Sequence, residues 1–235
     1  MSDKRPSEAH WRSLALFLLS AIFIFVTMYE LYSGINTLHR LEVVESERDQ
    51  WQRPADILRV LDLREGNIVL DLGSGAGYFA LKLSPVLGNR GQVLAVDLRR
   101  LSLFFLWTRA LLRGQHNIHI IVGEDDDPHL PTGTVDRVLI CNTYHEFSNP
   151  ELMLNHVIRS LRPGGNLVVV DRAPRAIGAE QTHEMSLTVV EGELRQTGFE
   201  IVSQDDHFID RPGDDLWWLL VARKPSVART GSGGS

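Results

Sequence analysis

The stretch DLGSGAGYF, residues 71–79, follows directly on the apolar run 68–72 and places three glycines within five positions. A strand that ends in a glycine-rich turn is typical of the first βα unit of a doubly wound sheet, where ligands bind beyond the carboxyl ends of the strands. Gly73 permits the tight turn, Gly75 lets the main chain approach the ligand, and Gly77 lets the following helix pack close to the strand. The stretch therefore predicts both a fold and a binding site.

Short apolar runs alternate with helical patterns from Pro54 onward, which predicts βαβ units and a parallel sheet covered on both faces. The C-terminal part differs, because residues 209–215 form a Pro-Gly turn short enough only for an antiparallel connection. The predicted strands are 68–72, 93–98, 118–122, 135–141, 167–171, 199–208 and 216–223, and the predicted helices are 76–87, 101–112, 150–161 and 184–197. The expected fold is a doubly wound α/β fold with a seven-stranded, mostly parallel sheet that ends in an antiparallel hairpin.

Length and composition limit the classes of function. A chain of 235 residues allows one domain plus an appendage. Its formal charge of −6 gives no electrostatic reason to expect a polyanion, so nucleic acid is not expected as a partner. Cys141 is the only cysteine in the sequence, which rules out intramolecular disulfides and cysteine-rich metal sites.

The N-terminal region contains an uncharged apolar segment, residues 14–29, between Arg12 and Glu30. As a helix, residues 13–32 would span roughly 30 Å, the thickness of a bilayer core. Trp11 and Tyr32 lie near its two ends, where aromatic rings commonly sit at headgroup depth. We predict a membrane anchor; the alternatives are a buried or surface-lying helix and a cleaved signal peptide. The flanking charges differ too little to fix its orientation.

The glycine turn suits two kinds of anionic group, the pyrophosphate of a dinucleotide or the carboxylate of an amino-acid-like cofactor. Its spacing is G-x-G-x-G, whereas the dinucleotide fingerprint is G-x-G-x-x-G, and this difference weakly favours the second ligand. Asp97 ends the next apolar run, where a carboxylate can accept hydrogen bonds from both ribose hydroxyls of either ligand. The alternative is that Asp97 caps the following helix.

Five segments in order resemble the successive motifs of class I S-adenosylmethionine-dependent methyltransferases. They are DLGSGAGYF (71–79), VLAVDLRR (93–100), IVGEDDDPHLP (121–131), VDRVLICNTYHEF (135–147) and SLRPGGNLVVVD (160–171). The resemblance runs from about Glu47 to Lys224. The sequence is most similar to a bacterial branch of this family whose members share four segments, E-R-D-x-W, D-D-P-x-L-P, Y-H-E-F and His-x-Met. In this sequence they are residues 47–51, 126–131, 144–147 and 183–185. The apolar N-terminal segment is not part of that pattern.

The resemblance implies S-adenosylmethionine as the cofactor. It implies that the ribose binds Asp97 and that Leu98 packs on the adenine. Glu124 or Asp125 would accept from the adenine amino group, and Asn142 would lie beside the sulfonium and the methionyl amino group. The methionyl part would be surrounded by Asp71, Gly73, Ser74, Gly75, Gly77 and Tyr78.

Methyl transfer requires the protein to align the acceptor about 3–3.5 Å from the methyl group, to exclude water and to remove any acceptor proton. Tyr144, His145 and Glu146 follow the predicted strand 135–141 and are the candidates to face the acceptor. His145 is the predicted general base or acceptor-orienting group, and His183 is predicted to line the same pocket. Alternatively, His145 only packs under the fifth strand and Glu146 caps the helix that begins at Asn149 and Pro150. No metal site is predicted, because the spacing matches no metal motif.

These predictions favour a membrane-anchored methyltransferase that acts on a small lipophilic acceptor such as a quinone, isoprenoid or lipid headgroup. The alternatives are a non-catalytic subunit docked in a membrane protein complex and a nicotinamide oxidoreductase. Because S-adenosylmethionine is made in the cytosol, the catalytic domain is expected to face it. Residues 103–107 (LFFLW) are expected to rest on the membrane or to cover the pocket. The expected parts are a tail (1–12), a transmembrane helix (13–32), a stalk or lid helix (33–53), the methyltransferase domain (54–225) and a flexible tail (226–235).

Overall fold

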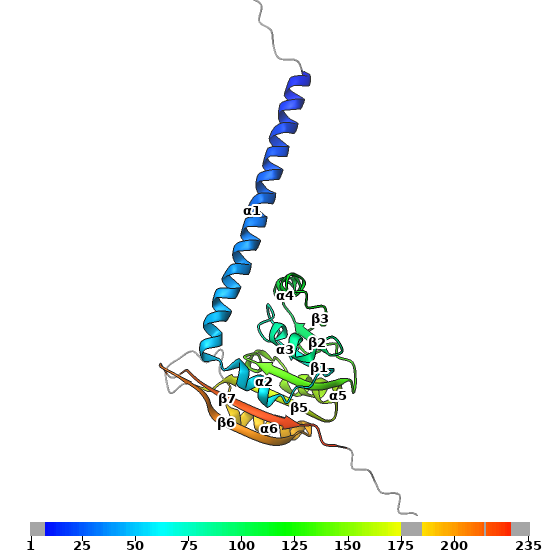
Figure 1. Cartoon of the computed structure of the whole chain (residues 1–235), viewed down its shortest axis with the longest axis vertical. Helices are drawn as coiled ribbons and strands as arrows, with labels where there is room; N and C mark the ends of the chain where they lie inside the picture. Colours follow the sequence, from blue (N-terminus) through cyan, green and yellow to red (C-terminus); the bar gives the residue numbers. More distant parts are fainter. Residues whose placement is uncertain (1–7, 175–184, 214, 227–235) are drawn as a thin grey trace, which may run out of the picture. The chain divides into compact units, whose positions relative to one another are not determined.

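The computed structural model describes residues 8–174, 185–213 and 215–226 (Figure 1). The chain divides into two compact units, Met1–Glu47 and Arg48–Ser235. The sheet lies entirely in the second unit.

The first unit is built from helix α1, which runs without interruption over Glu8–Trp51 and ends inside the second unit. The predicted membrane segment and the predicted stalk are therefore one helix. The hydroxyls of Ser20, Thr27 and Thr37 donate to the carbonyl four residues earlier at 2.8–2.9 Å, so these polar groups are satisfied within the helix itself. By length and composition, residues Leu16–Trp51 could cross a membrane.

The second unit contains one seven-stranded sheet with the order β3-β2-β1-β4-β5-β7-β6. Strands β1 to β5 pair in parallel and β7 pairs antiparallel with both β5 and β6, so the predicted doubly wound sheet with a C-terminal hairpin is confirmed. The hairpin turns at Pro212 and Gly213, and Gly213 has a φ of 87°. The strands are β1 Ile68–Leu72, β2 Gln92–Asp97, β3 Ile118–Val122, β4 Val135–Cys141, β5 Leu161–Arg172, β6 Glu200–Arg211 and β7 Asp215–Arg223.

Helices cover both faces of the sheet because successive strand residues point to opposite sides and both sets are apolar. One core cluster joins the sheet to α2, α3 and α4, and the other joins it to α5 and α6. Trp217 and Trp218, adjacent on β7, are each 1% exposed and enter opposite clusters. The helices are α2 Pro54–Val60, α3 Ala80–Leu87, α4 Arg100–Leu112, the 3-10 helix η1 Tyr144–Glu146, α5 Pro150–Ser160 and α6 Leu187–Thr197.

Some boundaries differ from the sequence prediction, and two short helices were not predicted. Helix α3 begins at Ala80 rather than at residue 76, because Gly73, Gly75 and Gly77 all have positive φ and cannot continue a helix. Strand β5 begins at Leu161 rather than at 167 and passes through a Pro-Gly-Gly segment that resembles a turn. Helices α2 and η1 were not predicted, because each is too short to show the repeating pattern of apolar residues by which a helix is identified in a sequence.

Gly77 makes room for a helix other than the one predicted. A Cβ at this position would overlap Leu106 of α4, so the glycine allows α4, not α3, to approach the turn. Gly66 has a similar φ, 88° against 97° for Gly77, but a Cβ there would meet open space.

We expect Gly77→Ala to lower the free energy of unfolding by about 2–5 kcal/mol, the sum of a positive-φ penalty and overpacking. Gly66→Ala, the matched control, should cost only the backbone penalty of about 1–2 kcal/mol. Denaturant unfolding of the full chain in detergent micelles measures both. If the two variants lose equal stability, the contact with Leu106 is not what selects glycine at position 77; adding Leu106→Ala should recover part of the loss.

Candidate functional site

The candidate site lies where the strand order reverses, beyond the carboxyl end of β1 and between β2 and β4. The amides of Gly73 and Ser74 donate to the Val96 carbonyl at 2.8 and 2.9 Å, which fastens the glycine turn to the end of β2. The amide of Gly75 donates to Asp97 Oδ2 at 2.8 Å. The turn and the carboxylate predicted from sequence are therefore direct neighbours.

Glycine is required at two points of this turn for different reasons. At Gly73, with φ 79°, an added Cβ would overlap the Thr143 side chain, so the glycine lets the turn lie against the loop after β4. At Gly75, with φ 55°, a Cβ would meet nothing within 4 Å. Gly75 thus presents bare backbone to open space, as a cradle for a ligand requires.

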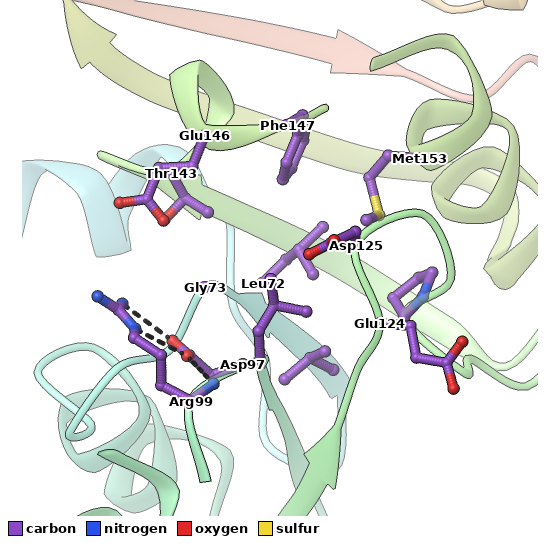
Figure 2. A pocket seen from close by; sticks show the side chains of 13 residues that line it. Leu72, Gly73, Asp97, Arg99, Glu124, Asp125, Thr143, Glu146, Phe147 and Met153 are labelled. Atoms are coloured by element: carbon purple, nitrogen blue, oxygen red, sulfur yellow. Dashed lines mark hydrogen bonds and ion pairs between the residues drawn. The ribbon is translucent and has the colours of Figure 1, made fainter. Parts of the chain in front are cut away.

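A pocket opens beside Asp97 and is shown in Figure 2. Its polar rim combines Arg99 and the loop residues Glu124 and Asp125 with Thr143 and Glu146. The Asp97 carboxylate accepts from the amide of Arg99 at 2.8 Å and from its Nε at 3.1 Å. The N-cap of α4 is Arg99, without a side-chain cap hydrogen bond, so the alternative that Asp97 caps this helix is wrong. The remaining lining residues are Leu72, Gly73, Val96, Leu98, Pro128, Phe147 and Met153.

Two buried polar atoms near the turn lack a hydrogen-bond partner among the described residues, Asp71 Oδ2 and Ser74 Oγ. Burial raises the pKa of Asp71 to about 7, and the neighbouring charge of Asp97 adds to this rise. Such an acceptor gains most from a cationic donor, because a positive charge would both satisfy the oxygen and favour the carboxylate form.

Asn142 lies at the carboxyl end of β4 with a φ of 56°, in the left-handed region that asparagine tolerates better than most residues. Its amide donates to the Val170 carbonyl at 2.8 Å, which ties the end of β4 to β5. Strained backbone of this kind clusters at functional sites. Asn142 and its neighbour Thr143 thus lie on the β4 side of the crevice.

The C-terminal turn of α1 contributes residues that sequence reasoning did not assign to the site. The Arg48 guanidinium lies 4.0 Å from the centre of the Tyr78 ring, and its Nε donates to Gln52 Oε1 at 2.7 Å. Gln52 is fully buried and donates to Cys141 Sγ at 3.3 Å. The charge of Arg48 opposes the effect of burial on the pKa of Asp71, which places a cation near the ends of β1 and β4. The E-R-D-x-W segment of the sequence, which contains Arg48, could have indicated that this turn of α1 belongs to the site.

Tyr78, predicted to bind cofactor, has its hydroxyl engaged elsewhere. The hydroxyl donates to Asp49 Oδ1 at 2.7 Å. The Lys82 ammonium lies 4.5 Å from the centre of the Tyr78 ring. Burial and the Asp49 carboxylate both raise the pKa of Tyr78. Tyr78 therefore joins the glycine turn to the end of α1.

Of the three residues of η1, Glu146 lines the pocket whereas Tyr144 and His145 do not. Tyr144 is fully buried, and its hydroxyl donates to Glu193 Oε2 on α6 at 2.6 Å, so it is absent from the pocket lining. Glu146 lines the pocket, and the N-cap of α5 is Asn149, whose side chain accepts from the Leu152 amide at 3.0 Å. The capping alternative for Glu146 is therefore wrong.

His145 forms a buried pair with Asp171, a residue of β5 that sequence reasoning did not assign to the site. Its Nδ1 lies 2.9 Å from Asp171 Oδ1, and the two side chains are 4% and 0% exposed. Burial lowers the pKa of His145, but Asp171 raises it by more, and the resulting pKa lies above the usual value. His183 lies outside the described residues. Within the described part of the chain, no group of three or more His, Cys, Asp or Glu side chains is arranged to hold a metal ion.

Comparison with known proteins gives the class of this fold. The family model described as the ubiE/COQ5 methyltransferase family matches residues 21–190, more than half of the chain. Protein-L-isoaspartate O-methyltransferase 1 of Archaeoglobus fulgidus is 30% identical over 116 residues, which cover 49% of this chain and 50% of that protein. The ubiquinone/menaquinone biosynthesis C-methyltransferase UbiE of Azotobacter vinelandii is 28% identical over 167 residues, 71% of this chain and 61% of that protein.

The first of these curated relatives is matched over about half of its length. Among solved structures, a SAM dependent methyltransferase from Aquifex aeolicus has a TM-score of 0.67 at 24% identity, covering 79% of this chain and 97% of that one. This likeness shows the fold, in agreement with the strand order and the glycine turn. The chain belongs to the ubiE/COQ5 methyltransferase family.

Proposed function

We propose that this chain binds S-adenosylmethionine at the switch point and transfers its methyl group to a small lipophilic acceptor, while α1 anchors it in a membrane. The observation that carries the proposal is the unpartnered, buried Asp71 Oδ2 beside a turn whose Gly75 faces open space and bonds Asp97. This arrangement offers an acceptor for an ammonium group and an acceptor for a sugar near the carboxyl ends of two neighbouring strands, β1 and β2. The family match supports the same cofactor and reaction class.

The residues present suit each part of this cofactor. Asp97 would accept from the ribose hydroxyls, and the apolar slot ending at Leu98 would hold the adenine, with Glu124 and Asp125 at its rim. Asp71 and Ser74 would accept from the α-ammonium group, because both have an unused buried oxygen. Arg48 would bind the carboxylate at the far end. When bound, the cofactor supplies a methyl group already activated by a positive sulfur.

The remaining task of the protein is to place the acceptor and to take its proton. A carboxylate can only accept, so Asp171 holds the proton of His145 on Nδ1, and the neutral ring then carries its basic lone pair on Nε2. Asp171 also accepts from the Arg172 amide at 2.8 Å, which fixes the carboxylate. We assign His145 as the base and Asp171 as the residue that positions it; His183 is proposed to line the acceptor side.

The proposed function is tested by binding and turnover with the full chain in detergent micelles. Calorimetry should show binding of S-adenosylmethionine and its demethylated product but not of NADH. Labelled S-adenosylmethionine with a membrane lipid extract should yield a labelled lipophilic product. Binding without transfer to any fraction would favour the non-catalytic subunit, and binding of NADH alone would favour an oxidoreductase.

The proposed binding of the cofactor's carboxylate by Arg48 can be tested separately from the binding of its ribose by Asp97. Loss of a hydrogen bond to a charged group costs about 1.5–3 kcal/mol, so Arg48→Ala should raise the Kd for S-adenosylmethionine about 10- to 100-fold. 5′-Methylthioadenosine lacks the amino-acid tail, and its Kd should stay unchanged. Asp97→Asn, the matched variant on the ribose side, should weaken both ligands. Equal weakening of both by Arg48→Ala would mean that Arg48 acts by supporting Tyr78 rather than by binding the tail.

The role of His145 predicts opposite pH trends for rate and stability. Because its folded pKa is raised, the pair with Asp171 stabilises the fold fully below about pH 6.5, and this contribution is lost as pH rises through the folded pKa. The rate should rise over the same interval, since a base must be unprotonated.

Asp171→Asn should move the midpoint of the acid limb of the kcat profile to lower pH, which pH–rate measurements will show. Asp136→Asn, which changes a carboxylate at the amino end of β4, is the control and should leave the midpoint in place. If Asp171→Asn shifts the pH dependence of the unfolding free energy but leaves the midpoint of the kcat profile in place, His145 has a structural role and is not the base.

A further inference from the structure

Helix α4 is apolar on its outward face as well as on the face it buries. Leu103, Leu106 and Ala110 are buried against the sheet. Five large apolar side chains point outward and are 53–74% exposed, namely Leu101, Phe104, Trp107, Leu111 and Leu112. Such a helix normally presents polar residues to water. Thr108 is the polar residue nearest this stripe, and its hydroxyl donates to the Phe104 carbonyl at 2.9 Å, which further reduces the polarity of the face.

These five residues share the outward face of α4, and Leu98 is exposed just before the helix begins. We call these six residues the α4 patch: Leu98, Leu101, Phe104, Trp107, Leu111 and Leu112. The ring centres of Phe104 and Trp107 are 6.2 Å apart. Among the described residues of the second unit, the other exposed large hydrophobic side chains are three valines on different elements, Val86, Val189 and Val202. Apolar exposure is thus concentrated on α4, and a patch of this kind marks an interaction surface.

Charge around the patch favours an anionic partner. Arg99 and Arg100 lie at the N-terminal end of α4 and Arg113 follows its C-terminal end, while the helix itself contains no acidic residue. A second copy of the chain is a poor occupant, since pairing of two α4 helices in either direction would bring arginine against arginine with no acidic residue of the helix between them. Arg99 is itself paired with Asp97, and the other nearby carboxylates, Glu124 and Asp125, lie beside Leu98 at the pocket. Aromatic and leucine side chains flanked by arginines suit the headgroup region of an anionic bilayer.

Covalent connection to α1 adds to this preference. If α1 spans a bilayer, the second unit is tethered to it, and a weak surface then binds at high effective concentration. One apolar contact of modest size binds membranes only reversibly, whereas two signals on one chain give stable association. A lipid surface is therefore the occupant that we favour, because α1 would tether the patch to the same membrane that it spans.

We propose that the α4 patch is a second membrane-contact surface that lies on anionic lipid headgroups. The proposal rests on the membrane anchoring by α1 proposed above. Leu98 belongs both to the patch and to the lining of the cofactor pocket. Contact of the patch with lipid therefore brings one wall of that pocket to the bilayer boundary, where a lipophilic acceptor is concentrated.

Fluorescence quenching by brominated phospholipids tests the proposal on the full chain in nanodiscs. Trp107→Phe isolates the Trp107 signal by difference, and Trp11→Phe isolates that of Trp11, at the start of α1. Trp107 should be quenched most by bromines placed near the headgroups, and at least twofold more with phosphatidylglycerol than with phosphatidylcholine alone. Raising the salt concentration should reduce that preference.

Leu111→Glu should reduce the quenching of Trp107 several-fold. The matched control is Val202→Glu, which places the same charge at a residue of similar exposure, 49% against 54%, on β6 away from the patch. The control should leave quenching unchanged, and unchanged binding of S-adenosylmethionine in micelles will show that both variants are folded.

Three results would overturn the inference. Quenching of Trp11 without quenching of Trp107 at any depth would leave the anchor in place and reject the α4 patch as a lipid surface. Absence of both signals would reject the anchor as well. Energy transfer between labelled copies that is lost in Leu111→Glu, with Trp107 unquenched, would identify the patch as an interface between two copies.

Discussion

The hydrogen bond from the Gly75 amide to Asp97 joins the carboxyl ends of two neighbouring strands, and the rest of the site depends on it. It forms only because the turn after β1 follows a path with three positive φ values, which side chains with a Cβ rarely adopt. The same path presses Gly73 against Thr143 and leaves Gly75 facing open space. The pocket is thus lined by Gly73 of the turn and by the Asp97 carboxylate.

Three aspartates at the carboxyl ends of strands receive different environments and hence different roles. Asp71 on β1 is buried with an unused oxygen, Asp97 on β2 is paired with Arg99, and Asp171 on β5 is paired with His145. Burial without a partner favours protonation, whereas a cationic partner favours the charged form. One residue type can therefore take the three roles proposed above, because each strand end supplies a different partner.

The end of α1 belongs to the catalytic unit rather than to a passive linker. The compact second unit begins at Arg48, and Arg48, Trp51 and Gln52 contact Tyr78, Trp217 and Cys141. These contacts fix the start of the unit against both the glycine turn and the C-terminal hairpin. A helix that is apolar enough to span a membrane at one end therefore completes the cofactor side of the fold at its other end.

The sequence by itself determined the seven strands, the antiparallel hairpin at the C-terminal end and the positions of the glycine turn and Asp97 at the ends of strands, because periodicity and turn chemistry are local properties. Tertiary structure alone decided which polar groups meet. Asp171 joined His145, Tyr144 turned toward Glu193, and Arg48 reached the turn. Each of these contacts joins residues from separate elements, so it depends on strand register and helix packing, which no local pattern encodes.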